Sequence, residues 1–387
     1  MDFNFTEEQE MLRATLRRFC QNKLNKEKVR WMDENCDFMP DEVWNGLTEL
    51  GVMGLTIPEQ YGGTGLGQME QAIVIDELST ATPAAALGVG ATLGFGATPI
   101  LHLGTPEQKE KHLPRIAAGK EKWAMALTEP AGGTDILGAI STKAEDKGDH
   151  WVINGVKVFI TAAHVADYMI VIAITNPDVK RAKGLSVFIV PRKSDGLETK
   201  LIPKLGCHSC GANYVYFDGV KIPKENLLGT LHHGWGELLT VLNPERIGTA
   251  CMSLGVAQAA FNDAFQYARE RQAFGGPISR FQSLQHYLAD IAIEIENARN
   301  LIYKCAWLAD NGKPFHIEAC MAKIVAARAS EKAVIWGMEI LGGYGYTMEY
   351  DMQRYFRDYK QMVFSPISDE MAKNMIMQFM GFPKSWS

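Results

Sequence analysis

The stretch HWVINGVKVFIT, residues 150–161, decides the fold class, because the helical period of the segments before it is absent here. Its Asn154-Gly155 step is favoured at two-residue hairpin turns, so the stretch predicts two strands around a tight turn. Residues 213–222, NYVYFDGVKI, repeat this arrangement around Asp218-Gly219. The middle of the chain, from about Trp123 to Gly229, is therefore predicted to be a β region.

Helical patterns lie on both sides of this β region. Thr6 and Gln9 have the spacing of a capping box. Apolar residues then recur on one face of the helix, at Leu12, Leu16, Phe19 and Cys20. Long helical patterns resume after Gly234. The order predicts an α+β chain with an N-terminal helical domain (1–122), a middle β domain (123–232) and a C-terminal helical bundle (233–387).

Composition limits the partners. The 387 residues are 47% hydrophobic and 22% charged, with a net charge of −6, as in an ordinary globular protein without a basic field. We therefore expect no nucleic-acid partner. The N-terminus is acidic and amphipathic, and no run looks long enough to span a bilayer, so we expect a cytoplasmic protein without a membrane partner. Seven irregularly spaced cysteines favour a reducing compartment without disulfides.

One cysteine pair has C-x-x-C spacing, at Cys207 and Cys210. Such a pair can form a redox dithiol or half of a zinc site. No second C-x-x-C or paired histidine cluster completes a tetrahedral site, and no helix N-terminus is evident there to activate a thiolate. The spacing is interpreted as a coincidence, and no metal site is expected.

Three glycine clusters indicate a ligand site. They are LTEPAGGTD (127–135), ERQAFGGPISRFQSLQ (270–285) and EILGGYGY (339–346). Glycines let backbone N–H groups approach a phosphate or a ring edge closely. Each cluster is a weak signal by itself, but the three together in an α, β, α chain are more specific.

With these clusters, the segments FTEEQEML, PEQYGGTG, GTPEQKEKHLP, INGVKVFIT and LGGYGYTMEYDMQRYFRD resemble the acyl-CoA dehydrogenase family of flavoproteins over essentially the whole chain. The resemblance implies a helical domain, a central β-barrel domain and a four-helix bundle, assembled as a homotetramer. It further implies FAD as cofactor, held between the β domain of one subunit and the bundle of its neighbour. An acyl-CoA substrate and an electron-transferring flavoprotein are the implied partners.

The resemblance also implies the cofactor contacts. Those from the β domain are Met125, Leu127, Thr128, Gly133, Thr134, Phe159 and Thr161. Those from the neighbouring bundle are Arg271, Phe274, Gln282, Glu339, Gly342 and Gly343, and the C-terminal segment adds Ser368 and Glu370. Phe159 replaces the more usual Trp. Glu339 replaces a Gln, and an ionised Glu beside a pyrophosphate is unfavourable unless it is protonated or paired.

The catalytic base is the main departure from the family pattern. Many members carry it in YEGTSEI shortly after RDAK, whereas RDYKQMVFSPISDEM places Ser365-Pro366 there. Members resembling isovaleryl-CoA and long-chain acyl-CoA dehydrogenases, and crotonobetainyl-CoA reductase-like proteins, place it on a bundle helix before an Arg. That position falls on Glu245, which is therefore the candidate base. Asp369 and Glu370, in the C-terminal segment, are the competing candidates.

The residues around Glu245 allow a second interpretation. Asn243, Pro244 and Glu245 also form an ordinary helix start, with a cap, a first-turn proline and an acid that complements the helix dipole. The resemblance implies that Arg246 is a buried structural and electrostatic residue of the pocket. Thr134, Asn243 and Arg246 are the implied substrate contacts.

The sequence says less about the acyl pocket and about the group that holds the thioester oxygen. Residues 84–97, AAALGVGATLGFGA, are unusually small, which leaves room for a branched, cyclic or otherwise bulky acyl group or else permits close helix packing. Pro366 lacks the N–H that would hold the thioester oxygen, so Ile367 or another donor must supply it.

The implied reaction is the FAD-dependent 2,3-dehydrogenation of an acyl-CoA, or its reverse, enoyl-CoA reduction. Glu245 removes the α-proton, and the flavin accepts the β-hydride. Two alternatives stay open. One is a non-redox lyase or elimination reaction on an acyl-CoA. The other is an inactive acyl-CoA-binding subunit, suggested by Pro366 and Glu339.

Overall fold

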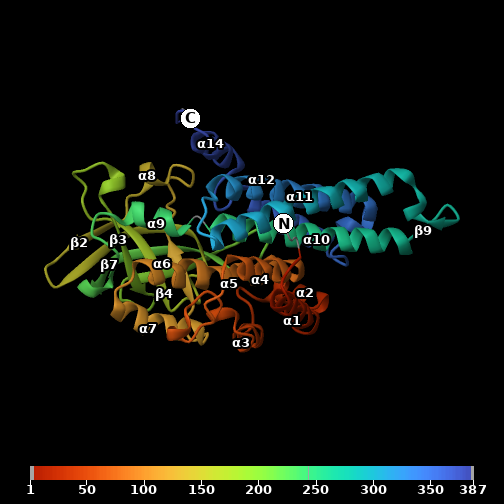
Figure 1. The fold of residues 1–387 in the computed structure, drawn as a ribbon. Coiled ribbons are helices and arrows are strands. Elements are labelled where there is room, and N and C mark those ends of the chain that lie inside the picture. The colour runs from red at the N-terminus through yellow and green to blue at the C-terminus, as the bar shows by residue number, and fades with distance from the viewer. Residues whose placement is uncertain (1–3, 243, 385–387) are drawn as a thin grey trace.

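Helices occupy both ends of the chain and strands the middle, as Figure 1 shows. The computed structural model describes residues 4–242 and 244–384. The N-terminal helices are α1 (Glu7–Lys23), α2 (Lys26–Asn35), α3 (Asp41–Glu49), α4 (Gln68–Ala81), α5 (Pro83–Thr92), α6 (Thr98–Leu103) and α7 (Pro106–Ala117). A short π-helical segment, Leu93–Ala97, joins α5 to α6.

The first helix forms as its sequence predicts. Thr6 Oγ1 accepts from the backbone N–H of Gln9 at 3.3 Å, and Gln9 Oε1 accepts from the backbone N–H of Thr6 at 3.1 Å. These reciprocal bonds satisfy donors that a helix start leaves unpaired. Leu16 and Cys20 are buried on the inner face of the helix. Capping and apolar periodicity therefore both hold for α1.

The middle of the chain forms one eight-stranded sheet. Its strands are β1 (Trp123–Ala126), β2 (Lys143–Asp146), β3 (His150–Thr161), β4 (Tyr168–Ile174), β5 (Leu185–Pro191), β6 (Leu197–Ile202), β7 (Ala212–Pro223) and β8 (Leu227–Leu228), with the short helix α8 (Ile136–Ala139) between β1 and β2. The hydrogen-bonded order is β6-β7-β3-β2-β4-β5-β8, and β1 pairs with β4 in parallel. The expected barrel is thus a sheet with edges at β6 and β8.

The two predicted hairpins are wrong. Residues 150–161 form one strand, β3, and residues 212–223 form another, β7, which pairs with it antiparallel. Asn154 falls at a register shift opposite Asp218-Gly219, and its Oδ1 accepts from the Gly219 N–H at 2.7 Å. The two glycine-containing dipeptides therefore face each other and form a bulge within long strands instead of turns at strand ends.

The sheet separates two cores. Ile170 and Ile172 of β4 face the core shared with the helices, whereas Met169 and Val171 face a second core. That second core collects side chains from β1, β2, β3, β4, β5 and β7, so the sheet curls around it. Successive strand side chains point to opposite faces, which explains why β4 is apolar throughout.

The C-terminal helices are α9 (Gly234–Leu242), α10 (Glu245–Glu270), α11 (Gln282–Asp310), α12 (His316–Leu341), α13 (Met352–Phe364) and α14 (Asp369–Phe379). Helices α10 to α13 pack into a bundle, α4 packs on α10, and α14 packs on α12. The glycine-rich segment after α10 forms the small hairpin of β9 (Gln272–Ala273) and β10 (Gly276–Pro277). Figure 1 shows this hairpin at the end of the molecule opposite the sheet.

One expectation about membranes needs correction. The continuous helical stretch Pro83–Leu103 has the length and apolar composition of a membrane span, although no such run was expected from the sequence. Two thirds of its most apolar window is buried inside the protein (67%), where α5 packs against α4, α10 and β1. Its apolar character is accounted for by this internal packing.

Candidate functional site

Glu245 is the first residue of α10. The helix begins directly after Pro244, whose carbonyl accepts from the N–H groups of Ile247 at 3.0 Å and Gly248 at 3.3 Å. The first-turn position of Glu245 is confirmed, with Pro244 one residue before the helix. Asn243 lies outside the described residues, and so do its expected roles as helix cap and substrate contact.

Burial makes Glu245 a weaker acid than an exposed glutamate. Desolvation raises the pKa of its carboxyl group from 4.5 to about 7, although the neighbouring Arg246 acts in the lowering direction. A group with a pKa near neutral can both remove and return a proton at physiological pH. The protonation behaviour of Glu245 therefore suits a general base.

Arg246 is buried and connects two helices of the bundle. One of its terminal nitrogens lies 3.8 Å from the sulfur of Met375 on α14, and its charge lowers the otherwise raised pKa of Cys320 on α12. The guanidinium thus lies where α10, α12 and α14 meet. This placement agrees with the structural and electrostatic role expected for Arg246.

Lys323 of α12 fixes the segment that carries the base in many family members. Its fully buried Nζ donates to the carbonyl of Val363 at 2.5 Å and to Asp369 Oδ1 at 2.7 Å. These bonds tie the end of α13 to the start of α14, where Ser368 caps the helix by accepting from the Met371 N–H at 3.2 Å. Asp369 is consequently occupied by an ion pair.

Of the three candidate carboxylates, only Glu245 is both partly buried and raised in pKa. Asp369 is paired with Lys323, and Glu370 is exposed, with its pKa lowered by backbone hydrogen bonding at the start of α14. Pro366 is only partly buried, and the next residue, Ile367, packs against Cys320 and Ile324. Because proline has no backbone N–H, the nitrogen of Pro366 cannot donate a hydrogen bond to a thioester oxygen.

Two helix faces near Glu245 are only partly buried and carry small residues. On α10 this face consists of Glu245, Gly248 and Met252, spaced three and four residues apart. On α5 and the following π-helical segment it consists of Leu87, Gly90 and Gly94. We call these two faces the slot faces. Helices α5 and α10 are in contact, and Leu87 and Met252 pack against the same cluster, so the slot faces converge there.

The glycines of residues 84–97 divide into two kinds. A Cβ added to Gly88 would lie 2.5 Å from Met39, and one added to Gly96 would lie 2.5 Å from Trp123, so these two allow close packing. At Gly90 and Gly94 an added Cβ would meet nothing within 4 Å, as at Gly248 on the opposite slot face. Close helix packing is therefore confirmed at Gly88 and Gly96, whereas room for an acyl group at Gly90 and Gly94 stays a prediction.

The β-domain residues expected to contact the cofactor lie on two adjoining segments. Met125 is on β1, Leu127 and Thr128 follow it, and the Thr128 carbonyl accepts from the Val158 N–H of β3 at 2.9 Å. Phe159 has a positive φ of 61° and is 66% exposed. Such a backbone conformation is unusual for a bulky residue and occurs preferentially at functional sites. Thr161 ends β3, and Gly133 and Thr134 lie in the exposed loop.

The bundle residues expected to contact the cofactor lie around a second feature. Arg271, Gly342 and Gly343 line one cavity of about 570 Å³, and the sequence did not single out the other lining residues, Tyr267, Ile278, Ile340, Leu341, Tyr344 and Thr347. The guanidinium of Arg271 lies 5.7 Å from the centre of the Tyr344 ring. The aromatic residues of GGYGYT, next to the glycines, were the available signal.

The remaining bundle positions are solvent-exposed. Phe274 is 87% exposed with a φ of 52°, and Gln282 is at the exposed start of α11. Glu339 is exposed in the last turn of α12 and does not line the cavity. An exposed carboxylate keeps its hydration, so the charge of Glu339 is less unfavourable than the sequence suggested.

Comparison with known proteins identifies the family. Residues 6–120, 124–220 and 232–381 match the acyl-CoA dehydrogenase N-terminal, middle and C-terminal domains. A probable acyl-CoA dehydrogenase of Bacillus subtilis is 36% identical, covering 97% of this chain and 98% of its own. The chain belongs to the acyl-CoA dehydrogenase family.

Other relatives of this acyl-CoA dehydrogenase family member work in both directions of the reaction. A subunit of the caffeyl-CoA reductase-Etf complex of Acetobacterium woodii is 37% identical, over 92% of this chain and 93% of its own. The structure of butyryl-CoA dehydrogenase from Megasphaera elsdenii superposes with a TM-score of 0.94 at 34% identity, covering 98% and 100% of the two chains. The protein is therefore an FAD-dependent oxidoreductase of the CH–CH group of acyl-CoA thioesters.

The residues present in this acyl-CoA dehydrogenase fit FAD. The bundle cavity offers a guanidinium for a phosphate and two glycines without neighbours at the Cβ position. Gly342 adopts a φ of 58° and a ψ of −134°, which strongly favours glycine. The β-domain segments offer an exposed aromatic ring and adjoining loop backbone. Figure 1 places the sheet and the β9–β10 hairpin at opposite ends of the molecule. Arg271 and Ile278, which flank this hairpin, line the bundle cavity.

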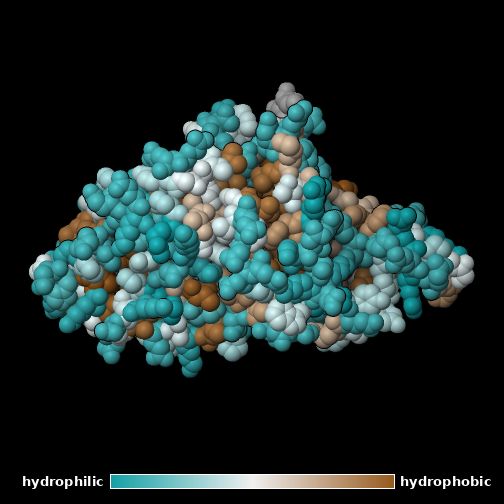
Figure 2. Space-filling view, turned by 90° about the horizontal axis from the view of Figure 1, so that it is seen from below, coloured by the Kyte–Doolittle hydropathy of each residue, from teal (hydrophilic) through white to brown (hydrophobic). Residues whose placement is uncertain are grey.

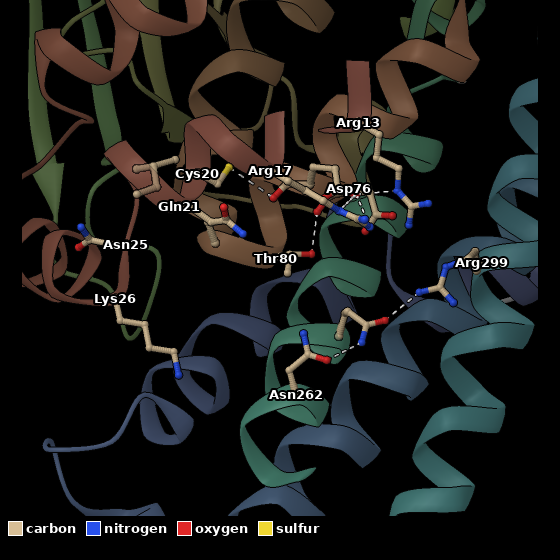
Figure 3. A pocket seen from close by; sticks show the side chains of 14 residues that line it. Arg13, Arg17, Cys20, Gln21, Asn25, Lys26, Asp76, Thr80, Asn262 and Arg299 are labelled. Carbon is tan, nitrogen blue, oxygen red and sulfur yellow. Dashed lines mark hydrogen bonds and ion pairs between the residues drawn. The ribbon is translucent and has the colours of Figure 1, made fainter. Parts of the chain in front are cut away.

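A different cavity, of about 610 Å³, lies between α1, α4, α10 and α11 and contains none of the expected site residues. Figure 3 shows the arginines of this cavity meeting acidic or amide side chains. Lys26 pairs with Asp263 at 2.6 Å. Arg13 and Arg17 both pair with Glu77, at 2.8 and 2.9 Å. Arg299 pairs with Glu296 at 2.8 Å. The charges of this cavity are thus largely compensated from within the chain, which gives it no clear preference for an anion.

The C-x-x-C pair has no sign of reactivity. Cys207 and Cys210 are buried, and burial raises the pKa of Cys207 well above its ordinary value and that of Cys210 to about 11. A thiol with so high a pKa carries little thiolate at neutral pH. All seven cysteines lie in the described part of the chain and are free.

Proposed function

We propose that Glu245 is the catalytic base of this acyl-CoA dehydrogenase. The single observation that carries the proposal is the partly buried carboxyl group at the start of α10, on the slot face, where desolvation raises its pKa to about 7. In the dehydrogenation direction it removes the proton from the carbon next to the thioester carbonyl. In the reductase direction the protonated carboxyl returns that proton. FAD, when bound, supplies the hydride acceptor or donor for the neighbouring carbon.

The acyl group of the substrate lies between the slot faces. Gly90, Gly94 and Gly248 leave unfilled space there, and Leu87 and Met252 close the end where the slot faces converge. This arrangement supports a branched, cyclic or aromatic acyl group over a short linear one. The name of the Acetobacterium woodii relative, a caffeyl-CoA reductase subunit, points to an aromatic acyl group for that protein.

The cofactor site is completed by a second copy of the chain. Its two halves lie at opposite ends of one subunit, which supports a site shared between subunits of a homotetramer. Large apolar side chains remain exposed on the bundle helices, at Ile293, Trp307, Met321, Ile335, Phe364 and Phe379. Figure 2 also shows apolar side chains exposed among hydrophilic ones on one face. Contiguous exposed apolar surface is typical of assembly interfaces.

Electrons leave or arrive through an electron-transferring flavoprotein. The caffeyl-CoA reductase relative is named as part of a complex with such a protein, which supports this partner. Thr134 and Arg246 assist the substrate from the β loop and from α10. The protein acts in the cytoplasm. It belongs to the subgroup of the family that carries the catalytic base on the bundle helix.

The experiment that tests the proposed reaction is anaerobic mixing of the purified holoprotein with saturated acyl-CoAs. The panel contains butyryl-CoA, isovaleryl-CoA and 3-phenylpropionyl-CoA. We expect the flavin absorbance near 450 nm to fall fastest with the bulky members. Dithionite-reduced protein should regain this absorbance with the matching enoyl-CoAs. An unchanged spectrum with the whole panel in both directions would contradict the proposed reaction.

A further inference from the structure

A fully buried ion pair joins the two β-domain segments that are expected to contact the cofactor. Lys157 of β3 has no exposed side-chain surface, and its Nζ lies 2.9 Å from Glu129 Oε1. The Glu129 side chain is only 2% exposed. Lys157 is two residues before Phe159, and Glu129 directly follows Thr128. The pair therefore lies directly between the two segments.

The contacts of this pair reach backbone on both sides. Lys157 Nζ also donates to the carbonyl of Leu127 at 2.9 Å. Glu129 accepts from the Ser141 N–H at 2.8 Å, from the Ser141 hydroxyl at 2.6 Å and from the Thr142 N–H at 3.0 Å. One lysine and one glutamate thus hold the start of the loop, its return at residues 141–142 and strand β3 together.

The energetics of buried ion pairs favour a role other than stability. Removing two charges from water costs about as much as their attraction returns, and apolar replacements of such pairs are often neutral or stabilising. Burial lowers the pKa of Lys157 to about 8, while the pKa of Glu129 is lowered to about 2 because Lys157 and its hydrogen-bond donors outweigh its burial. Both groups therefore remain ionised at neutral pH, and each is needed to compensate the other.

The loop between the two ends has little support of its own. Residues 130–135 are mostly exposed, and Gly133 has no neighbour within 4 Å of a Cβ position. Gly155 lets strand β3 approach Thr142 closely, because a Cβ added at Gly155 would lie 2.3 Å from Thr142 Oγ1. The buried pair therefore holds the base of a loop whose tip has few contacts.

We propose that Lys157 and Glu129 are positioning residues that hold Leu127, Thr128 and Phe159 in the arrangement that binds FAD. The pair does not touch the reacting atoms. It fixes the backbone of both segments before the cofactor binds. Less conformational entropy is then lost on binding, and the free-energy cost of binding is smaller. This inference rests on the cofactor contacts proposed above.

The test compares Glu129→Gln and Lys157→Met with the matched control Glu121→Gln. Glu121 is also 2% exposed and lies in hydrogen-bond contact with three side chains, those of His112 and Arg115 on α7 and of Trp123 at the start of β1, the end of this strand opposite Leu127. Two quantities are measured on full-length protein: the FAD dissociation constant of the apoprotein, and hydrogen exchange over residues 127–142. Circular dichroism checks that each variant is folded.

We expect Glu129→Gln and Lys157→Met to raise the FAD dissociation constant at least fivefold and to accelerate exchange over residues 127–142. Glu121→Gln should lose stability without either effect. If Lys157→Met does not fold, Glu129→Gln decides the outcome. A dissociation constant within twofold of wild type, or unchanged exchange, would overturn the positioning role. Wild-type protein that binds no FAD would instead overturn the cofactor assignment, and the positioning role with it.

Discussion

At the scale of single residues, the pKa proposed to suit Glu245 for catalysis also affects the stability of the fold. A first-turn glutamate is ordinarily favoured as the anion by the helix dipole, yet here desolvation prevails and raises the pKa to about 7. The folded protein consequently binds more protons than the unfolded chain between pH 4.5 and 7. Each increase in pH across that window costs stability, and the loss is complete above pH 7.

Replacing Glu245 by Gln should therefore stabilise the protein at high pH. We expect Glu245→Gln to raise the free energy of unfolding by about 1–2 kcal/mol at pH 8, because the ionised group is no longer buried. At pH 4 the variant and the wild type should agree closely. Urea unfolding at both pH values measures the difference. A variant that is less stable than wild type at pH 8 would show that Glu245 is not destabilised by its surroundings.

At the scale of elements, the acyl site proposed between α5 and α10 depends on glycines at specific helical positions. Gly90 and Gly94 lie on one slot face and Gly248 on the other, and none has a neighbour within 4 Å of a Cβ position. The π-helical segment Leu93–Ala97 carries Gly94, and π-helical segments are common at functional sites. In the proposed acyl site, the side chains at these three positions would thus set the available width.

Narrowing one slot face should change substrate preference. We expect Gly94→Val to lower kcat/KM for 3-phenylpropionyl-CoA by about tenfold or more, because the added methyl groups occupy space that a ring would need. Butyryl-CoA should be affected by less than about threefold. Gly236→Val is the matched control, since Gly236 is a helical glycine with equally open surroundings on exposed α9. Equal losses for both substrates in Gly94→Val would remove Gly94 from the acyl site.

At the scale of the whole molecule, the fold class and element order were predictable, whereas the strand arrangement was not. The change from helical to alternating periodicity near Trp123 is local and visible in the sequence. The pairing of Asn154-Gly155 with Asp218-Gly219 depends on two strands far apart in sequence, so each dipeptide alone resembled a turn. The ion pair of Lys157 and Glu129 has no periodic signal for the same reason.

The candidate site divides in the same way. The glycine clusters marked both cofactor regions, but only the structure shows Arg271, Gly342 and Gly343 around one cavity. Glu245 was named through family resemblance, since a helix start explains its surroundings equally well. Its burial depends on how α10 packs in the fold, which no local pattern contains. Figure 1 shows the sheet and the β9–β10 hairpin at opposite ends of one chain, a separation that no local pattern contains.

The rate of flavin bleaching in Glu245→Gln tests the central claim most directly. The variant holoprotein is mixed anaerobically with the acyl-CoA that the wild type oxidises fastest, and the absorbance loss near 450 nm is followed by stopped flow. Glu49→Gln, which removes an exposed carboxylate at the end of α3, is the control. We expect Glu245→Gln to retain its flavin and bleach at least a hundredfold more slowly, since positioned bases contribute about 10²–10⁴ in rate. Bleaching within tenfold of wild type in Glu245→Gln would contradict the assignment of Glu245 as the base.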